Sequence, residues 1–462
     1  MTSRSPPRLR SAIPAVAFPA VADATGASML SLLYQFERSE WWPAEMVRWQ
    51  QFRQLEALLT HAIRYVPALQ PGLAAAGYRP DGELTEDIWR RIPILTRRDV
   101  QTLGKNLHAT RDPSGHGARH EFQSSGSTGT PIAGVQTERF LLFWHAMTLR
   151  DYLWQGLDLE ARLGVIRYVH GATAKSDDTT LPAWTGAAGA TFANGPAFVF
   201  DVNQKVSAQL DWVRRVDPDY LLAYPSGLKE LLREAQRRGV RPGRLRAVKT
   251  FGEQLHDGLR DQLRTQWGVP LHDLYSAIET GYLALQCPEN EHYHVMAESA
   301  VVEILDRADR PCAAGEVGRV VVTPLHNFAM PLVRYDIGDY AEAGPPCPCG
   351  RGLPVLRRIL GRVRNMLILP DGGVRWPDVQ QPISRAGLPV IQFQVVQRTR
   401  TALEARLVVE RALSAAEEDA LRASLNEHCG AAFDVSFTYV SEVPRSRGGK
   451  YEDFYSEVAG RA

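Results

Sequence analysis

The segment Ser124-Ser125-Gly126-Ser127-Thr128-Gly129-Thr130-Pro131 carries more information about the fold class than any other stretch of this chain. It places two glycines and five hydroxyl residues in eight positions. Glycine allows a positive φ and close approach of the backbone, and backbone N–H groups together with hydroxyls can surround a phosphate. No lysine follows the second glycine, so the loop is not of the Walker type. Composition alone leaves a phosphate-binding loop and a flexible polar loop equally open.

Strand-like and helix-like segments alternate downstream of this loop. Apolar, β-branched runs predict strands over 163–169, 219–225, 246–252, 299–305 and 317–325. Helical patterns lie between several of them, over 205–216, 227–238 and 257–267. Upstream, apolar residues at steps of three and four predict a helix over 46–66, and 96–103 reads as another. This alternation predicts an α/β fold with a largely parallel sheet.

The last hundred or so residues have a different pattern. Strands are predicted over 391–397, 403–410 and 433–440, and Ser414 with Glu417 forms a capping box that opens a helix. This stretch reads as a small α+β unit. The predicted domains are a flexible N-terminal arm over 1–28, a large domain over 29–362 and a C-terminal domain over 363–462.

Composition excludes several function classes. The 462 residues are 44% hydrophobic and 23% charged, which excludes a disordered chain. Lys and Arg total 53 and Asp and Glu total 52, so no nucleic-acid or anionic-membrane partner is expected. Apolar runs are shorter than the roughly 18 residues of a membrane span. The odd number of cysteines, five, favours free or metal-bound thiols and a cytoplasmic location.

Further motifs follow the glycine-rich loop in a fixed order: Phe251-Gly252-Glu253-Gln254, Asp273-Leu274-Tyr275-Ser276-Ala277-Ile278-Glu279, Arg334-Tyr335-Asp336-Ile337-Gly338-Asp339, Gly361-Arg362 and Gly448-Gly449-Lys450. With the loop, this order resembles the adenylate-forming superfamily of acyl-CoA synthetases, luciferases and peptide-synthetase adenylation domains. It most resembles the phenylacetate–CoA ligase (CapK-like) branch, and the segment 92–100 is similar to that branch as well. The resemblance covers most of the chain.

The resemblance implies a fold and a reaction. The fold is a large adenylate-forming domain of layered sheets and helices, followed by a small, mobile α+β domain. ATP activates a carboxylic acid, expected to be aromatic, as an acyl-adenylate, and coenzyme A is the expected acceptor. Transfer to an amine without coenzyme A stays open, as does a non-catalytic nucleotide-binding protein. The expected partners are therefore small molecules, and a homodimer is left open.

The resemblance also implies roles for single residues. Lys450 is the catalytic residue, reaching the carboxylate and the α-phosphate, and Glu279 is the Mg²⁺ ligand. Asp339 accepts from the ribose hydroxyls, Asp273 from the adenine amino group, and Tyr275 stacks on the base. The implied phosphate-binding residues are Ser124, Ser125, Gly126, Ser127, Thr128 and Gly129. The other implied nucleotide contacts are Gly252, Glu253, Ser276 and Arg362.

Four positions depart from the pattern of the resembled family. The usual hinge aspartate is Arg364, and the threonine before the glutamate is Ile278. The glycine after Tyr275 is Ser276, and the arginine after the tyrosine of the ribose turn is Asp336. These changes leave the nucleotide site in place but put the rates, and the second half-reaction itself, in question.

A set of cysteines and histidines suggests a metal site. Three Cys and one His complete a tetrahedral zinc site, and Cys287, His294, Cys347 and Cys349 are the chosen ligands. His292 is the alternative fourth ligand. The spacing is not a standard C-x-x-C pair, so exposed thiols on a proline-rich loop are the other interpretation. Some members of the resembled branch carry a structural metal here, which favours zinc.

Aromatic residues in the middle of the chain are candidates for the acid-binding pocket. The region that would line it contains Tyr168, His170, Trp184, Phe192 and Tyr224. Their aromatic character suggests an aryl acid, although aromatic side chains more often belong to a core.

Overall fold

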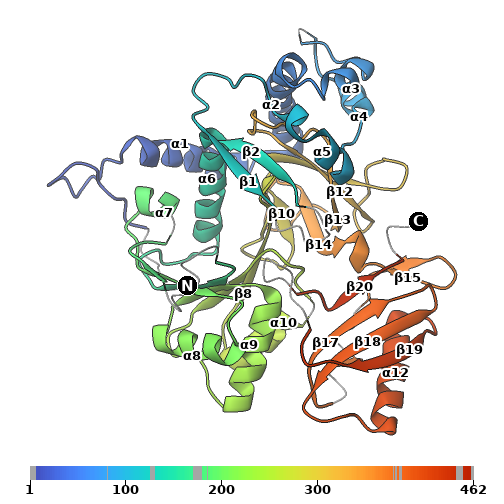
Figure 1. Ribbon diagram of the computed structural model, residues 1–462. Coiled ribbons are helices and arrows are strands. Elements are labelled where there is room, and N and C mark those ends of the chain that lie inside the picture. Colours follow the sequence, from blue (N-terminus) through green and yellow to red (C-terminus); the bar gives the residue numbers. More distant parts are fainter. Residues whose placement is uncertain are drawn as a thin grey trace. The chain divides into compact units, whose positions relative to one another are not determined.

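The computed structural model describes residues 7–80, 82–124, 131–169, 179–184, 186–256, 258–377, 379, 382–383, 388–443 and 451–458, apart from the side chains of 186–188. The chain divides into two compact units. The first contains Met1–Ile337 and Ala341–Ile359, and the second contains Gly338–Tyr340 and Leu360–Ala462. Figure 1 shows the elements of both.

The first unit begins with helices, which are α1 (Ala24–Ser39), α2 (Ala44–Tyr65), α3 (Gln70–Ala75), α4 (Glu86–Arg91), α5 (Arg97–Leu103) and the 3-10 turn η1 (Gly104–Leu107). The helix predicted over 46–66 is confirmed as α2, which buries the stripe of Leu55, Leu58, Leu59 and Ala62.

The segment before α1 differs from the expected flexible arm of residues 1–28. Helix α1 already begins at Ala24, where the Asp23 side chain accepts from the N–H of Gly26. Further upstream, the Arg10 N–H donates to the carbonyl of Thr191 at 3.0 Å. Leu9 forms an isolated antiparallel bridge with Phe192. These backbone contacts attach the described part of the arm to the first unit.

A two-stranded hairpin, β1 (Arg119–Gln123) and β2 (Ala133–Thr137), leads into helix α6 (Glu138–Trp154). The strands pair antiparallel from Arg119 opposite Thr137 to Gln123 opposite Ala133. The glycine-rich segment is therefore the connection of this hairpin. Thr137 caps α6, because its side chain accepts from the N–H of Phe140.

The large sheet has the order β11-β12-β13-β14-β10-β9-β8-β7-β6-β3-β5-β4. Its parallel part contains β3 (Leu163–Arg167), β5 (Ala197–Asp201), β6 (Tyr220–Ala223), β7 (Ala247–Thr250) and β8 (Leu271–Ala277), with β4 (Thr179–Leu181) antiparallel at the edge. The connections contain α7 (Gly186–Thr191), α8 (Val206–Val216), α9 (Pro225–Arg238) and α10 (Leu259–Trp267).

Helices cover both faces of the parallel part (Figure 1). Successive residues of one strand point into different cores, as Val165 packs with α6 residues while Ile166 packs with residues of α8, α9 and α10. This alternation follows from the period of two along a strand. It produces the helix–sheet–helix layering that alternating strands and helices predicted.

The remaining strands correct the expectation of a largely parallel sheet. They are β9 (Gly281–Gln286), β10 (Tyr293–Val295), β11 (Ala300–Leu305), β12 (Val317–Pro324), β13 (Tyr335–Ala343) and β14 (Val355–Arg362). The predicted strands at 299–305 and 317–325 form an antiparallel pair, with Ala300 opposite Pro324. No helix lies between them, so the chain turns straight back and a parallel crossover is not possible.

In the residues that the structure describes, the second unit contains a four-stranded sheet packed against a long helix. Its sheet order is β19-β18-β17-β20, and α12 contributes Leu421 and Leu425 to the core. The predicted capping box is confirmed, since Ser414 and Glu417 exchange side-chain and backbone hydrogen bonds. The elements are η3 (Val363–Asn365), β15 (Leu367–Ile368), β16 (Val374–Arg375), β17 (Val390–Gln397), β18 (Ala402–Val409), α12 (Ala415–Cys429), β19 (Asp434–Tyr439) and β20 (Phe454–Ser456).

Among the helices that the structure describes, none combines the length and the apolar character required to cross a bilayer.

Candidate active site and metal cluster

The topology of the parallel strands singles out one edge of the sheet. In space the order is β5-β3-β6-β7-β8, so the chain runs outward from β3 to β5 and then returns past β3 to β6. Open α/β sheets bind ligands beyond the carboxyl ends of the strands, at the place where the strand order reverses. Tyr168, Tyr224 and Gly252 follow the carboxyl ends of β3, β6 and β7.

The base of the glycine-rich loop is fixed by Ser124. Its N–H donates to the carbonyl of Ile132, and its hydroxyl accepts from the N–H of Ile132, each at 2.8 Å. These two hydrogen bonds extend the β1–β2 pairing by one residue pair and hold the two ends of the loop together. The predicted site residues outside the described residues are Ser125, Gly126, Ser127, Thr128, Gly129, His170 and Lys450.

Glu279 lies in the turn between β8 and β9, and its side chain is only 5% exposed. A guanidinium nitrogen of Arg97 is 3.9 Å from a carboxylate oxygen of Glu279. Another nitrogen of Arg97 donates to the Ser124 hydroxyl at 3.4 Å. The buried Gln136 of β2 donates to the carbonyl of Ile278. The loop base, the Glu279 turn and the start of α5 therefore meet.

The loop after β7 is built around a glycine and a capping carboxylate. Gly252 has a φ of +75°, a conformation that side chains other than glycine rarely adopt. Glu253 accepts from both the N–H and the hydroxyl of Ser226, in the first turn of α9, at 3.0 and 3.1 Å. In this structure the Glu253 carboxylate thus stabilises the start of α9.

Two of the predicted pocket tyrosines lie together beside this loop. The ring of Tyr224 is 4.8 Å from that of Phe251, and Tyr224 also makes a hydrogen bond to the backbone of Tyr168. Burial raises the pKa of the Tyr224 hydroxyl, so this group remains a neutral donor. Tyr168, Tyr224 and Phe251 form an aromatic cluster at the carboxyl ends of β3, β6 and β7, in which Tyr224 is buried.

Asp273, expected to accept from an adenine amino group, is instead enclosed by protein groups. One of its carboxylate oxygens accepts from the Thr250 hydroxyl at 2.6 Å and the other from the Tyr293 hydroxyl at 2.7 Å. Its own N–H donates to the side chain of Gln286. Asp273 therefore holds β7, β8 and β10 in register. Nearby, the β8–β9 pairing shifts register between Tyr275 and Ser276, a bulge of the kind that redirects side chains.

The buried Asp273 should make stability depend on pH. Burial raises the pKa of its carboxyl from 3.8 to about 6. The folded chain therefore binds this proton more tightly than the unfolded chain, and the free energy of unfolding should fall as pH rises from about 4 to about 6. Asp273→Asn should remove this contribution, which urea unfolding of both proteins across that range would measure. A stability difference between them that stays constant with pH would contradict the assignment.

In the second unit, two predicted nucleotide residues lie together. The Arg362 guanidinium is 3.5 Å from the carboxylate of Asp339. The unusual Arg364 has a partner, since its guanidinium is 2.8 Å from Glu452 and also lies over the ring of Tyr455. An aspartate at position 364 could not pair with Glu452, so this ion pair gives the departure from the family pattern a physical reason.

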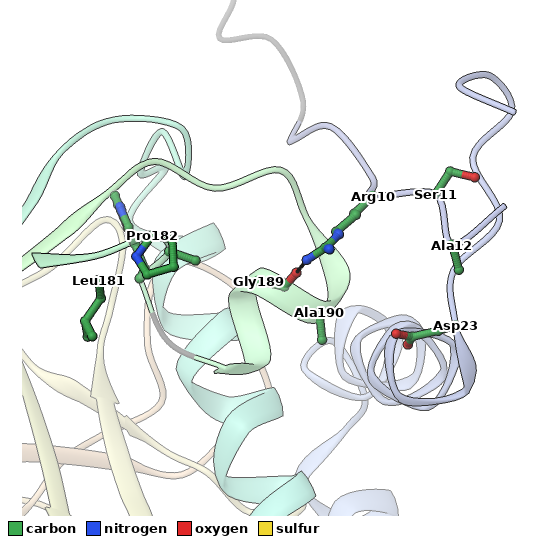
Figure 2. A pocket seen from close by; sticks show the side chains of 10 residues that line it. Arg10, Ser11, Ala12, Asp23, Leu181, Pro182, Gly189 and Ala190 are labelled. Carbon is green, nitrogen blue, oxygen red and sulfur yellow. Dashed lines mark hydrogen bonds between the residues drawn. The ribbon is translucent and has the colours of Figure 1, made fainter. Parts of the chain in front are cut away.

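Trp184 and Phe192 lie in a different core from the cluster of Tyr168, Tyr224 and Phe251. The Trp184 indole N–H donates to the carbonyl of Ala161, just before β3, and its ring packs on Tyr220 at the start of β6. Trp184 is thus core at the amino ends of the strands, and Phe192 pairs with Leu9. Trp184 also borders a cavity of about 660 Å³, where Arg10 reaches the carbonyl of Gly189 (Figure 2).

The four chosen cysteine and histidine ligands converge in the first unit. Cys287 follows β9, His294 lies in β10, and Cys347 and Cys349 lie on the connection from β13 to β14. Their ligand atoms all lie within 4.8 Å of one another. The sulfurs of Cys287 and Cys347 are 3.8 Å apart, and the Cys349 sulfur is 3.4 Å from Nε2 of His294.

These distances fit the edges of a zinc tetrahedron. Bond lengths of about 2.3 Å to sulfur and 2.0–2.1 Å to nitrogen give edges of about 3.8 Å between sulfurs and about 3.6 Å between sulfur and nitrogen. Burial lowers the pKa of His294 to about 4, which keeps the imidazole in the neutral form that binds metals. Nε2 of His292 is 2.9 Å from the Cys347 sulfur, the distance of a hydrogen bond to a ligand.

Arg97, Tyr293 and Glu452 were not predicted as site residues. Arg97 lies in the segment 92–100 that resembles the family, but there it indicated only the start of a helix. Tyr293 lies between two candidate metal ligands, and Glu452 lies two positions after Lys450. Their partners are far away in the sequence, so no local pattern could identify them.

Comparison with known proteins gives a consistent result. The model of the CapK C-terminal domain family matches residues 372–456. A phenylacetate–coenzyme A ligase of Thermus thermophilus is 27% identical over 91% of this chain and 98% of its own length. The enzyme of the same name from Escherichia coli is 24% identical over 86% and 92%, respectively. The resemblance predicted from the motifs is confirmed.

Solved structures show the same fold. A 2-hydroxyisobutyryl-CoA ligase in the postadenylation state superposes with a TM-score of 0.72 at 17% identity, covering 91% of this chain and 92% of that one. The anthranilate CoA ligase AuaEII, in complex with anthranoyl-AMP, gives a TM-score of 0.53 at 17% identity over 71% and 65%. The predicted fold class, a large adenylate-forming domain with a small α+β domain, is confirmed.

Proposed function

We propose that this adenylate-forming ligase of the phenylacetate–CoA ligase type activates an aromatic carboxylic acid with ATP and transfers the acyl group to coenzyme A. The observation that carries the proposal is the meeting of the glycine-rich loop base, Glu279 and Arg97 beside the carboxyl ends of the parallel strands. Such an arrangement suits a triphosphate, because it combines a backbone-rich loop with a cation and a metal-binding carboxylate.

The proposed chemistry has two steps. A carboxylate oxygen of the acid attacks the α-phosphorus of ATP, the bond to the β-phosphate oxygen breaks, and pyrophosphate leaves. The coenzyme A thiol then attacks the acyl carbon and AMP leaves. Lys450 stabilises the negative charge that develops in the first step. Asp339 binds the ribose hydroxyls, Arg362 lies near the ribose or phosphates, and the loop 124–131 holds the β- and γ-phosphates. Residues 363–462 form the mobile lid that removes Lys450 between the steps.

Two metal ions belong to the proposal. Mg²⁺ would be held by Glu279 and the phosphates, and its charge would stabilise the leaving pyrophosphate. The buried carboxylate of Glu279, next to the loop base, supports this role. A structural zinc would be held by Cys287, His294, Cys347 and Cys349, as their spacing supports. Because that site needs reduced thiols, a cytoplasmic location remains part of the proposal.

An aromatic acid is supported by the aromatic cluster of Tyr168, Tyr224 and Phe251. A flat, apolar ring gains by packing against tyrosine and phenylalanine faces, which favour offset or tilted stacking. The buried, neutral Tyr224 hydroxyl can in addition donate a hydrogen bond. Glu253, in contrast, is engaged at α9, so we propose that this loop contributes through Gly252 and the backbone.

Pyrophosphate release from ATP, with hydroxylamine as the trap, tests this function across a panel of aryl and aliphatic acids. We expect release only with certain aryl acids, and formation of a thioester once coenzyme A is added. Release of AMP that depends on an amine instead of coenzyme A would replace the second step. If no acid causes pyrophosphate release while ATP still binds, a non-catalytic nucleotide-binding protein would be favoured.

A further inference from the structure

Arg97 is held in place by local and long-range backbone contacts. It is the first residue of α5, whose capping box joins Thr96 and Asp99. Just before it, the Leu95 N–H donates to the carbonyl of Arg334 at 2.9 Å, and the Leu95 carbonyl accepts from Asp336 at 2.8 Å. The backbone from which the Arg97 side chain extends is therefore fixed next to Arg334 and Asp336.

The Arg97 side chain lies between the two phosphate-side groups of the proposed site. It contacts Ser124, the first residue of the glycine-rich loop, and lies 3.9 Å from Glu279. The side chains of Arg97 and Glu279 are 19% and 5% exposed, respectively. A carboxylate this deeply buried is costly to leave without a counter-charge. Among the residues that the structure describes, Arg97 is the basic residue that lies within ion-pair distance of Glu279.

We propose that Arg97 is a phosphate-binding residue that changes partners when ATP binds. Without nucleotide, it neutralises Glu279. When Glu279 binds the Mg²⁺ of incoming ATP, Arg97 donates to an oxygen of the β- or γ-phosphate. A guanidinium suits both tasks, because its planar set of N–H donors matches carboxylate and phosphate oxygens equally well. This inference rests on the proposed adenylation, because it assigns the triphosphate to the same site.

The test compares the binding of MgATP with the binding of AMP by calorimetry. Arg97→Ala should weaken MgATP binding by about 10- to 100-fold, the range for a hydrogen bond to a charged group. AMP has no β- and γ-phosphates, so its affinity should stay within about twofold of wild type. Arg97→Lys should restore part of the MgATP affinity, since it keeps the charge but loses the planar geometry. Arg98→Ala, at the exposed next position of α5, is the matched control and should bind both nucleotides like wild type.

Each outcome decides the role of Arg97. If Arg97→Ala weakens AMP and MgATP equally, or leaves MgATP binding unchanged, the proposal is overturned. Where the alanine variant does not fold, Arg97→Gln provides the same comparison with a polar side chain. Because the readout is binding, it is separate from the proposed function. A wild-type protein that binds MgATP but activates no acid would overturn adenylation and leave the Arg97 result standing.

Discussion

Replacing Lys450 with alanine is expected to slow acyl-adenylate formation by about 10²- to 10³-fold, the range seen when one group that stabilises developing charge is removed. Binding of ATP should change little, because the loop 124–131, Glu279 and Asp339 all remain. The measurement is pyrophosphate release at saturating ATP and acid, together with the dissociation constant for ATP. The expected signature is a loss in kcat with little change in binding.

The chain around position 450 supports this expectation. Two residues later, Glu452 pairs with Arg364 at 2.8 Å, and β20 then runs parallel to β17. The segment that follows Lys450 is thus anchored to the core of its own unit. Lys105→Ala is the control, since Lys105 is an exposed lysine of η1. That variant should release pyrophosphate at the wild-type rate. Unchanged release in Lys450→Ala would remove Lys450 from the mechanism.

Replacing Cys347 with serine is expected to abolish zinc binding and to lower the unfolding temperature of the first unit by several degrees. A closed zinc site of this kind holds about one ion per chain and contributes directly to folding free energy. Here the metal would join the end of β9, strand β10 and the connection from β13 to β14, in addition to the direct pairing of β10 with β9 and with β14. Elemental analysis of the purified protein and thermal unfolding measure both effects.

The contacts of the loop that contains Cys347 explain why loss of the metal should also destabilise neighbouring elements. Arg351 donates to Glu40 at 3.1 Å, and Glu40 also pairs with the buried Arg150 of α6. Releasing the loop therefore loosens the end of α1 as well. Cys312→Ser is the matched control, because Cys312 lies outside the cluster. Wild-type protein that carries no metal and unfolds like Cys347→Ser would disprove the zinc site.

How well the sequence predicts a structural feature of this protein depends on how far apart in the sequence the interacting residues lie. Helices α2 and α12 follow from apolar spacing and from the capping box of Ser414 and Glu417, all of which act within a few residues. The parallel strands β3, β6 and β7 follow from alternation with helices, whereas β5 and β8 were not predicted as strands. The pairing of β11 with β12 was missed, because a strand pattern does not specify the direction of its partner.

The candidate site divides in the same way. The order of the motifs predicted the resemblance to the phenylacetate–CoA ligase branch, and the residue types of the cluster at 287, 294, 347 and 349 predicted a metal site. Tertiary structure alone decided that the hydroxyls of Tyr293 and Thr250 donate hydrogen bonds to the Asp273 carboxylate, and that Trp184 is a core residue. It also brought Arg97 between Ser124 and Glu279. Local sequence determines which conformation a residue can adopt and which chemical groups it offers. The partner of a buried charge is decided by long-range packing, because only the folded chain excludes water and brings a counter-charge close.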